Sequence, residues 1–336
     1  MAPTVHTVTL IPGDGIGPEI SECAKRMIAA SGAKISWEEV EAGAALADAT
    51  GNPIPDRVLD SIRKNRVALK GPIGTPIGTG FRSVNVTLRK ALNLYACVRP
   101  IKSIPNISKR YPEVDFIIVR ENMEGEYSGL EHMVVPGVAE SLKVITEEGS
   151  LRIAKYAFQL ARDLGRDKVT AVHKANIMKL TDGLFLSCVR RISAKYPEVS
   201  HEELIVDNCA MQLVKNPAQF DVLVMTNLYG DILSDLGAGL VGGLGVVPGA
   251  NIGDEYAVYE AVHGSAPDIA GKGIANPTAL TLSACMMLRQ LNLGECADRI
   301  EKSIYGVFEK GEGLTRDLGG TANSKEFTDA VIAAMK

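Results

Sequence analysis

The sequence predicts an α/β protein built on a largely parallel sheet. Short apolar runs alternate with helical patterns from one end of the chain to the other, which is typical of α/β folds. Most of these runs are bounded by polar residues, as expected of strands that helices cover on both faces. With 336 residues, the chain is long enough for about two domains at roughly 150 residues each.

The predicted elements follow in chain order. A strand is expected over residues 6–11, followed by a helix over 18–30 that has a proline in its first turn. Leu151, Ala154, Phe158 and Ala161 recur on one face of another helix. Further strands are expected over 67–70, 116–119, 169–173 and 222–226, and further helices over 277–291 and 324–335.

One segment differs in composition from the rest of the chain. Residues 237–249 carry six glycines in thirteen positions. Such a segment is typical of a mobile or tightly packed connection between lobes. We therefore expect a domain boundary close to it.

Composition and charge exclude several classes of function. The chain has 36 Lys and Arg against 40 Asp and Glu, a net charge of −4, so we expect no nucleic-acid partner. No apolar run approaches the roughly 18 residues of a membrane helix, and the first ten residues do not resemble a signal peptide. Six scattered cysteines without a C-x-x-C pair predict buried thiols in a reducing compartment. We expect a cytoplasmic protein without a membrane partner, or a mitochondrial-matrix protein if a transit peptide has been removed.

Residues 11–19 read I-P-G-D-G-I-G-P-E and suggest a dinucleotide-binding turn. The Rossmann fingerprint requires G-x-G-x-x-G/A, but here Gly13 and Gly15 are followed by Pro18 at the third position. Glu38 and Glu39 are weak evidence for a ribose ligand because they lie in a glutamate-rich stretch. We interpret the motif as a tight strand-to-helix turn and expect the cofactor site elsewhere.

Two small polar residues and three arginines are candidates for binding an anion. Ser83, Asn85 and Arg89 lie within two helical turns, although Ser83 could equally be a helix N-cap. Arg99 stands at an expected strand end, where it could also be a surface residue. Arg120 directly follows an apolar strand, and strand ends are where α/β proteins place ligands. Because guanidinium groups bind carboxylates in a bidentate manner, we expect a carboxylate ligand.

Two further residues are candidates for proton transfer. Tyr127 lies in a polar, glycine-flanked loop, where its phenol could be a general acid or simply a half-buried aromatic. Lys174 follows an expected strand. A lysine there is usually solvated, but in a cleft beside arginines its pKa would fall and it could transfer protons.

Three aspartates are candidates for holding a divalent cation. Asp231 and Asp235 lie four residues apart and therefore share one helix face, where two like charges repel unless something positive lies between them. A hard cation would satisfy both carboxylates. Asp207 ends a strand-like run and could be a third ligand, or a helix cap.

The last candidate segment, residues 260–276, reads E-A-V-H-G-S-A-P-D-I-A-G-K-G-I-A-N. The small residues around His263 would let a flat ligand approach the backbone. From the residues alone, the chain is interpreted as a metal- and anion-binding α/β enzyme.

Together these segments resemble the β-decarboxylating dehydrogenases, a family that comprises isocitrate, isopropylmalate, homoisocitrate and tartrate dehydrogenases. The resemblance covers essentially the whole chain, and its specific motifs are N-L-Y-G-D-I-L-S-D at 227–235 and H-G-S-A-P-D-I-A-G-K-G-I-A-N-P at 263–277. The segments S-V-N at 83–85 and R-E-N-M-E-G-E-Y-S-G-L-E-H at 120–132 are most similar to the NAD-dependent isocitrate dehydrogenase branch. An isopropylmalate enzyme would be expected to carry leucines in place of Ser83 and Asn85.

The resemblance implies a fold of two α/β lobes around an interdomain cleft, unrelated to the Rossmann fold. A large nucleotide-binding lobe would comprise residues 1–98 and 240–336. A small lobe, residues 99–239, would carry the dimer interface and the metal-site residues. The expected assembly is a homodimer or a larger homo-oligomer with active sites shared between subunits.

The resemblance also implies a reaction, the oxidative decarboxylation of isocitrate with reduction of NAD⁺. Tyr127 would protonate the enol formed on decarboxylation, with Lys174 as its proton-transfer partner, and Lys174 and Asp207 would reach in from the second subunit. Asp268 would favour NAD⁺ over NADP⁺. The implied sets are Ser83, Asn85, Arg89, Arg99 and Arg120 for substrate, Asp207, Asp231 and Asp235 for Mg²⁺ or Mn²⁺, and Thr75, Glu260, His263, Gly264, Ala266, Asp268, Ile269 and Asn276 for NAD.

Two alternatives remain open. The chain could act on homoisocitrate or isopropylmalate instead of isocitrate. It could also be a non-catalytic regulatory subunit of an isocitrate dehydrogenase, although retention of Tyr127, Lys174 and the three aspartates argues against this.

Overall fold

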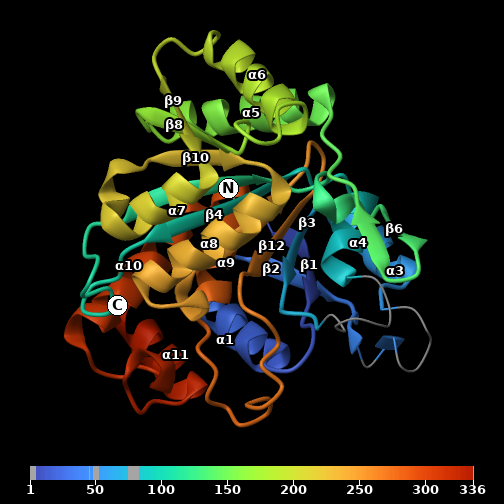
Figure 1. Ribbon diagram of the computed structural model, residues 1–336. Helices are drawn as coiled ribbons and strands as arrows, with labels where there is room; N and C mark the ends of the chain where they lie inside the picture. The colour runs from blue at the N-terminus through green and yellow to red at the C-terminus, as the bar shows by residue number, and fades with distance from the viewer. Residues whose placement is uncertain (1–4, 45, 48–52, 75–82, 336) are drawn as a thin grey trace.

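The computed structural model describes residues 5–44, 46–47, 53–74 and 83–335. One twisted sheet runs through the molecule, with helices on both of its faces (Figure 1). Its ten strands, in spatial order, are β2 (Ile35–Glu39), β1 (His6–Ile11), β3 (Val67–Lys70), β12 (Ala257–Ala261), β11 (Pro248–Ile252), β4 (Ala96–Lys102), β5 (Asp115–Glu121), β10 (Val222–Met225), β8 (Lys168–His173) and β9 (Ser200–Ile205).

The two outer parts of the sheet are parallel and its centre is antiparallel. Strands β2, β1, β3 and β12 are parallel to one another, as are β5, β10, β8 and β9. Strands β11 and β4 join these parts through antiparallel pairings. The predicted α/β class and the largely parallel sheet are confirmed, since six of the nine pairings between neighbouring strands of this sheet are parallel.

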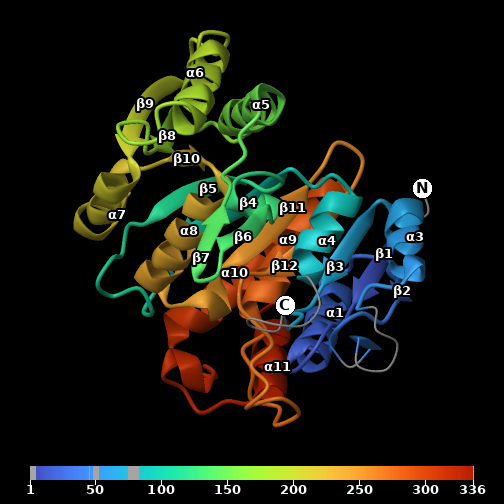
Figure 2. The ribbon, with the colours of Figure 1, turned by 45° about the vertical axis from the view of Figure 1, so that its right-hand side comes forward.

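Helices cover the sheet differently on its two faces (Figure 2). Helices α1 (Gly17–Ala30) and α9 (Thr278–Gln290) pack against the half of the sheet that contains β12. Helix α5 (Glu147–Asp163) packs over β5 and β10. Helix α8 packs over β4 and β5. The helices are α1 (Gly17–Ala30), α3 (Asp56–Asn65), α4 (Val84–Ala91), α5 (Glu147–Asp163), α6 (Thr181–Ser193), α7 (Val206–Lys215), α8 (Asn227–Val241), α9 (Thr278–Gln290), α10 (Gly294–Lys310) and α11 (Ser324–Ala334), with 3₁₀ turns η1 (Glu126–Ser128), η2 (Pro217–Gln219), η3 (Leu244–Val246) and η4 (Arg316–Leu318).

Local signals explain where several helices begin. The Thr146 hydroxyl accepts a hydrogen bond from the amide of Gly149 at the start of α5. Asn323 and Glu326 form a capping box at the start of α11. Such caps satisfy amides that have no partner within the helix, at about 1 kcal/mol each.

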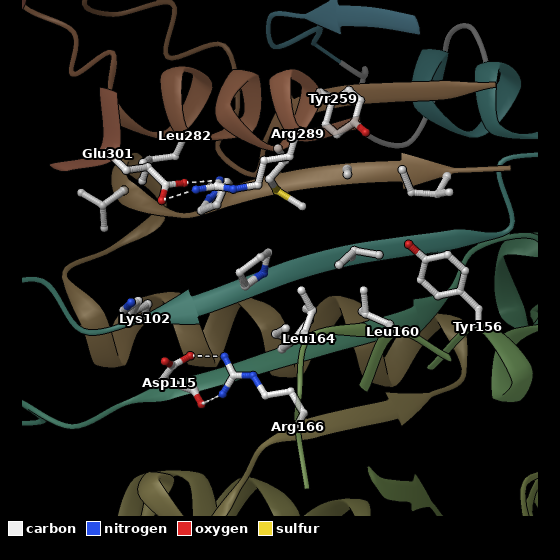
Figure 3. A pocket seen from close by; sticks show the side chains of 18 of the residues that line it. Lys102, Asp115, Tyr156, Leu160, Leu164, Arg166, Tyr259, Leu282, Arg289 and Glu301 are labelled. Carbon is white, nitrogen blue, oxygen red and sulfur yellow. Dashed lines mark hydrogen bonds and ion pairs between the residues drawn. The ribbon is translucent and has the colours of Figure 1, made fainter. Parts of the chain in front are cut away.

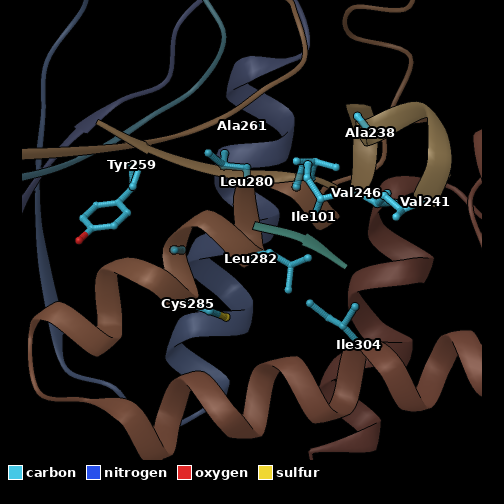
Figure 4. Close-up of a cluster of buried hydrophobic side chains, with 14 of the residues drawn as sticks. Ile101, Ala238, Val241, Val246, Tyr259, Ala261, Leu280, Leu282, Cys285 and Ile304 are labelled. Carbon is cyan, nitrogen blue, oxygen red and sulfur yellow. The ribbon is translucent and has the colours of Figure 1, made fainter. Parts of the chain in front are cut away.

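The core is aliphatic and continuous around the sheet centre (Figure 4). Ile101 of β4, Leu280 and Leu282 of α9 and Ile304 of α10 are buried there. Burying side chains of this size contributes about 1.5–3 kcal/mol each. This packing holds helices of the last third of the chain against strands of the first third.

The glycine-rich segment is tightly packed rather than open at its start. It begins inside α8, where a Cβ on Gly237 would lie 3.1 Å from Ile101 and 3.3 Å from Phe116. The boundary at 239/240 therefore falls within a helix, and the boundary at 98/99 falls within β4. The division into two lobes stays a prediction.

A hairpin of β6 (Glu131–Val135) and β7 (Val138–Ser141) stands apart from the main sheet. All of its residues are exposed, including Met133, Val134, Val135 and Val138. An isolated two-stranded hairpin is at best marginally stable in water, so this arm is suited to packing against another chain.

Candidate active site

Three predicted arginines converge on one side of the sheet centre. Arg89 comes from α4, Arg99 from β4 and Arg120 from the end of β5, and each has at most 7% of its surface exposed. Arg99 lies in the middle of its strand, which corrects the expectation that it stands at a strand end. Burial lowers the pKa of Arg120, and the nearby charges of Arg89 and Arg99 lower it further. Three buried guanidinium groups this close together are suited to a ligand with several carboxylates.

Asp231 and Asp235 of α8 face these arginines. Arg99 lies 3.7 Å from Asp231 and 3.6 Å from Asp235, and Arg120 forms an ion pair with Asp231. The positive charge that the spacing of the two aspartates requires is therefore present as Arg99. Burial raises the pKa of Asp235. Burial alone would also raise the pKa of Asp231, but Arg120, the Tyr127 hydroxyl and Arg99 together lower it.

A glycine allows this close approach. A Cβ on Gly230 would lie 2.5 Å from the Cβ of Arg120, so only glycine fits at this position of α8. The Arg120 guanidinium also donates two hydrogen bonds to Asn227 at the start of the same helix. The Asn227 and Gly230 positions of the N-L-Y-G-D motif thus hold Arg120 against α8.

Tyr127 lies in the same cluster. It belongs to the short turn η1, its hydroxyl donates to Asp231, and its ring centre lies 5.0 Å from the guanidinium carbon of Arg120. Burial, followed by the hydrogen bond to Asp231, raises the pKa of Tyr127. The phenol is therefore kept protonated and can act as a proton donor.

Lys174 and Asp207 lie elsewhere in the single chain. Their side chains form an ion pair with each other, at 2.6 Å, and neither contacts Tyr127 or Asp231 in the described part of the chain. Asp207 lies in the first turn of α7 rather than at a strand end. The apolar residues around them, Ile177, Leu180 and Met211, are at least half exposed.

A buried charge network beside the arginines was missed in the sequence. Lys70, 2% exposed, lies 2.6 Å from Glu260, and Asn251 donates to Glu260 and accepts from Arg89. Burial alone would raise the pKa of Glu260, but Lys70 and Arg89 lower it to about 2. The only signal for Lys70 was a lysine that ends a short apolar run before a glycine.

These groups line a small cavity, the arginine cavity, of about 120 Å³. Asn85 belongs to it, and its side-chain oxygen is buried without a hydrogen-bond partner among the described residues. Ser83 occupies the N-cap position of α4, as the alternative interpretation expects, although its side chain makes no capping hydrogen bond. Lining residues include Lys70, Asn85, Arg89, Arg99, Asn251, Glu260 and His263.

The segment around His263 forms a second cavity, the loop cavity, of about 510 Å³. Burial lowers the pKa of His263, and its Nε2 is buried without a partner among the described residues. Asp268 is exposed on the same loop, and Thr75 lies outside the described residues. Of the predicted cofactor residues, the structure brings His263, Gly264, Ala266, Ile269 and Asn276 together here.

The turn after β1 supports this loop. Gly13 and Gly15 have positive φ angles of 76° and 59°, as the tight-turn interpretation requires. The amide of Ile16 donates to the Ser265 carbonyl, and the Glu19 carboxylate accepts from the amides of Gly273 and Ala275. The motif thus positions the His263 loop.

The donor set partly fits a divalent cation. Asp231 and Asp235 offer hard carboxylate oxygens on one helix face, which Mg²⁺ and Mn²⁺ prefer. Among the described residues, no group of three or more His, Cys, Asp and Glu side chains could hold a metal ion. Within one chain, Asp231 and Asp235 would therefore supply only two carboxylate ligands to such a cation.

The fold and this site define an α/β protein whose three buried arginines are suited to a polycarboxylate. The isocitrate/isopropylmalate dehydrogenase family model matches residues 7–331, and the chain belongs to that family.

Similar proteins include both isocitrate dehydrogenases and an isopropylmalate dehydrogenase. The chain is 58% identical over 329 residues to the mitochondrial isocitrate dehydrogenase [NAD] catalytic subunit 5 of Arabidopsis thaliana, covering 98% of this chain and 88% of that one. It is also 58% identical over 305 residues to the chloroplastic 3-isopropylmalate dehydrogenase of Solanum tuberosum, covering 90% and 85%. The crystal structure of isocitrate dehydrogenase from Methylococcus capsulatus has a TM-score of 0.95 and 51% identity, covering 98% and 99%.

Proposed function

We propose that this protein is an NAD-dependent isocitrate dehydrogenase that converts isocitrate to 2-oxoglutarate and CO₂. The observation that carries the proposal is the convergence of Arg89, Arg99 and Arg120 with Tyr127 and Asp231. Three buried guanidinium groups match a tricarboxylate, and a protonated phenol beside them matches a reaction that ends in protonation.

The residues of this chain bind and orient the substrate. The arginines would hold the carboxylates of isocitrate. NAD⁺, when bound, would accept the hydride from C2 while a base takes the proton of the C2 hydroxyl. A divalent cation held by Asp231 and Asp235 would polarise the C2 hydroxyl and its neighbouring carboxylate. After loss of CO₂, Tyr127 donates its proton to C3, and Lys174 returns a proton to Tyr127. Asp231 accepts the Tyr127 hydrogen bond and so orients the phenol.

Asn85 favours isocitrate over isopropylmalate as the substrate. Identity to relatives does not separate the two, because both named relatives are 58% identical to this chain. The side-chain oxygen of Asn85 is buried in the arginine cavity and has no partner among the described residues. The amide nitrogen of Asn85 can donate a hydrogen bond to a third carboxylate, which an isopropyl group cannot accept.

The loop cavity is the proposed site of the adenosine half of NAD. Its volume suits a nucleoside, and its lining of small and aliphatic residues suits a flat ring. The carboxylate of Asp268, exposed beside it, would accept hydrogen bonds from ribose hydroxyls and repel a 2′-phosphate.

We propose a dimer as the smallest active unit. Leu180 is 87% exposed and Ile177 69%, close in sequence to Lys174, and Met211 and Ile232 expose apolar surface on α7 and α8. Such a surface is typical of a protein interface. A second copy packed there would bring its own Lys174 and Asp207 to the incomplete metal and proton-transfer site. The Arabidopsis relative is named as a subunit, so a hetero-oligomer is the second possibility.

We propose the mitochondrial matrix or the cytoplasm as the location. The Arabidopsis relative is named as mitochondrial, and all six cysteines are free thiols, as expected in a reducing compartment. No helix in the described part of the chain is long and apolar enough to cross a membrane.

The test is NADH formation by the purified chain alone, with Mg²⁺ or Mn²⁺ and with isocitrate, homoisocitrate or 3-isopropylmalate. We expect kcat/KM for isocitrate to exceed that for isopropylmalate by at least about 10². A preference for either other substrate would assign the chain to a sister enzyme. If the purified chain is inactive by itself and becomes active only with a second, different subunit, the chain would have a regulatory role.

A further inference from the structure

A large cavity lies on the sheet face opposite the arginine cavity. This rear cavity has a volume of about 500 Å³. Its floor is formed by β4, β5 and β11, one wall by α5, and the other wall by α9 and α10. Figure 3 looks into it, with Lys102 at one end and Tyr156 at the other.

The rear cavity and the arginine cavity share the same strands. Successive residues of a strand point to opposite faces of a sheet. On β4, Arg99 lines the arginine cavity whereas Val98 and Pro100 line the rear cavity. On β12, Glu260 lines the arginine cavity and Tyr259 lines the rear cavity. One layer of backbone therefore separates the two cavities.

The rear cavity is suited to an apolar body. Its floor and walls include Val98, Ile117, Leu160, Leu282 and Met286. The charged residues along its two sides are mostly paired, as Arg166 with Asp115 and Arg289 with Glu301 (Figure 3). A volume of this size with few polar groups is typical of a site for a small organic molecule.

A basic groove lies on the other side of Tyr156, which lines both the rear cavity and this groove. This groove is lined by Arg152, Lys155, Arg191 and Lys195, and by Asp254 as its only acidic residue. Its volume is about 800 Å³.

The positive charge of the basic groove is largely uncompensated. Of the four cations, only Arg191 forms an ion pair within the described residues, with Glu147. The Nε of Arg152 is buried and has no hydrogen-bond partner there. This local excess contrasts with the net charge of −4 of the whole chain.

We propose that the rear cavity and the basic groove together bind an amphipathic organic anion. The apolar body of the ligand fills the rear cavity, and its phosphate or carboxylate group binds Arg152, Lys155 and Lys195. The ligand is inferred to be an anion because the uncompensated charge of the basic groove is positive.

Occupancy of the rear cavity also acts on the substrate site. Strand β4 lines the rear cavity with Val98 and Pro100 and the arginine cavity with Arg99. A ligand that packs against Val98 and Pro100 therefore fixes the strand that carries Arg99. The ligand therefore strengthens isocitrate binding, and this second step rests on the proposed function.

Calorimetric titration with octyl phosphate tests the binding step in the absence of substrate. We expect octyl phosphate to bind, and inorganic phosphate and octyl glucoside not to bind at the same concentrations. The double variant Lys155→Glu/Lys195→Glu should weaken binding at least about tenfold, because both cations become like charges. Met286→Trp, which fills the cavity, should abolish binding. Lys325→Glu on α11 is the matched control and should leave binding unchanged.

Competition with isocitrate and NAD⁺ shows whether octyl phosphate binds in the rear cavity or in the arginine cavity. Saturating isocitrate and NAD⁺ should leave octyl phosphate bound, whereas displacement by isocitrate would overturn the proposal. Binding that survives both Met286→Trp and the lysine double variant would also overturn it. If Met286→Trp fails to fold, Leu160→Trp fills the same cavity from the other wall.

The kinetic step has its own readout. Saturating octyl phosphate should lower the KM for isocitrate about fivefold in wild type and leave it unchanged in the lysine double variant. An unchanged or raised KM would overturn the coupling between the faces. Because binding is measured without substrate, a chain that lacks isocitrate activity would refute the proposed function and leave the binding result standing.

Discussion

Arg120 shows how a single residue joins the fold to the site. It is 1% exposed, its guanidinium meets Asn227 and Asp231, and two other arginines lie close enough to lower its pKa. Holding three cations together costs free energy, which the carboxylates of Asp231, Asp235 and Glu260 offset in part. A bound polycarboxylate removes that cost and stabilises the folded protein in proportion to its affinity.

Tyr127→Phe should lower kcat by about 10²–10⁴ and leave the KM for isocitrate nearly unchanged. The change removes the proton donor but keeps the ring over Arg120. Steady-state kinetics across the pH range measure both constants, and Tyr305→Phe, remote from the arginine cavity, is the control. Equal activity of variant and wild type would exclude a role for the phenol.

Glu260→Gln should lower the free energy of unfolding at pH 7 by about 3 kcal/mol, because Lys70 stays buried without its carboxylate. The pKa of Glu260 is lowered to about 2, so its stabilisation is present above about pH 4.5 and lost as the pH falls toward 2. The variant should therefore lose less stability than wild type between pH 5 and pH 3.

Urea unfolding at several pH values measures both effects of Glu260→Gln. Glu301→Gln breaks the partly exposed pair with Arg289 and should cost no more than about 1 kcal/mol. Equal pH dependence in wild type and Glu260→Gln would show that Lys70 does not hold Glu260 ionised.

At the scale of elements, the sequence predicted β1, β3, β5, β8 and β10 of the parallel parts but missed β2 and β12 there. At the centre it missed β11 and ended β4 too early, at Arg99. Strands such as β10 are short apolar runs that periodicity detects. Strand β4 contains Arg99 and Pro100, and β11 contains Gly249 and Asn251, residue types that are depleted in strands. They form strands because both parts of the sheet flank them. Pro100 is tolerated because β11 pairs only with residues 96–98 of β4.

The sequence likewise predicted some residues of the candidate site and missed others. Arg89, Arg120, Tyr127, Asp231 and Asp235 were found because their motifs are specific, and the structure brings them together. Lys70 and Asn251 were missed because a lysine or asparagine beside a strand is usually solvated. Only tertiary burial turns them into partners of Arg89 and Glu260.

On helix α8, Asp231→Asn should raise the Mn²⁺ concentration needed for half-maximal activity by at least about tenfold. The amide keeps the shape but removes a negative ligand, and excess Mn²⁺ should restore part of the activity. Titration of activity with Mn²⁺ measures the change, and Asp329→Asn on α11 is the control. Unchanged metal dependence would remove Asp231 from the metal site.

On helix α4, the double variant Ser83→Leu/Asn85→Leu should shift the preference from isocitrate toward 3-isopropylmalate by at least about 10². The variant replaces hydrogen-bonding groups at the arginine cavity with apolar volume. The ratio of the two kcat/KM values is the measurement. Thr87→Leu, exposed one turn further along, should leave the ratio unchanged.

At the scale of the whole molecule, the proposed role of Lys174 requires two chains for one site, because Lys174 lies apart from Tyr127 in one chain. The Lys174–Asp207 pair and the Tyr127–Asp231 pair make no contact in the described part of one chain. Exposed apolar residues near Lys174 and the exposed hairpin β6–β7 provide the surfaces for association.

Mixing two inactive variants tests this sharing. Tyr127→Phe and Lys174→Ala chains, unfolded together and refolded, should recover up to about a quarter of wild-type activity. Half of the random dimers are mixed, and each mixed dimer has one site with both native residues. Each variant refolded alone is the control. Formation of mixed dimers, seen by native mass spectrometry, without recovered activity would place both residues in one chain's site.

The strand order also decides when the protein can fold during its synthesis. Strand β3 pairs with residues of β12 that lie 190 positions later in the chain, and β4 pairs with residues of β11 that lie 152–156 positions later. While the ribosome adds the intervening segments, the edges of β3 and β4 stay unpaired in the nascent chain. Unpaired apolar edges promote aggregation, and pairings this distant in sequence form slowly. The continuous sheet can therefore form only after β11 and β12 have emerged.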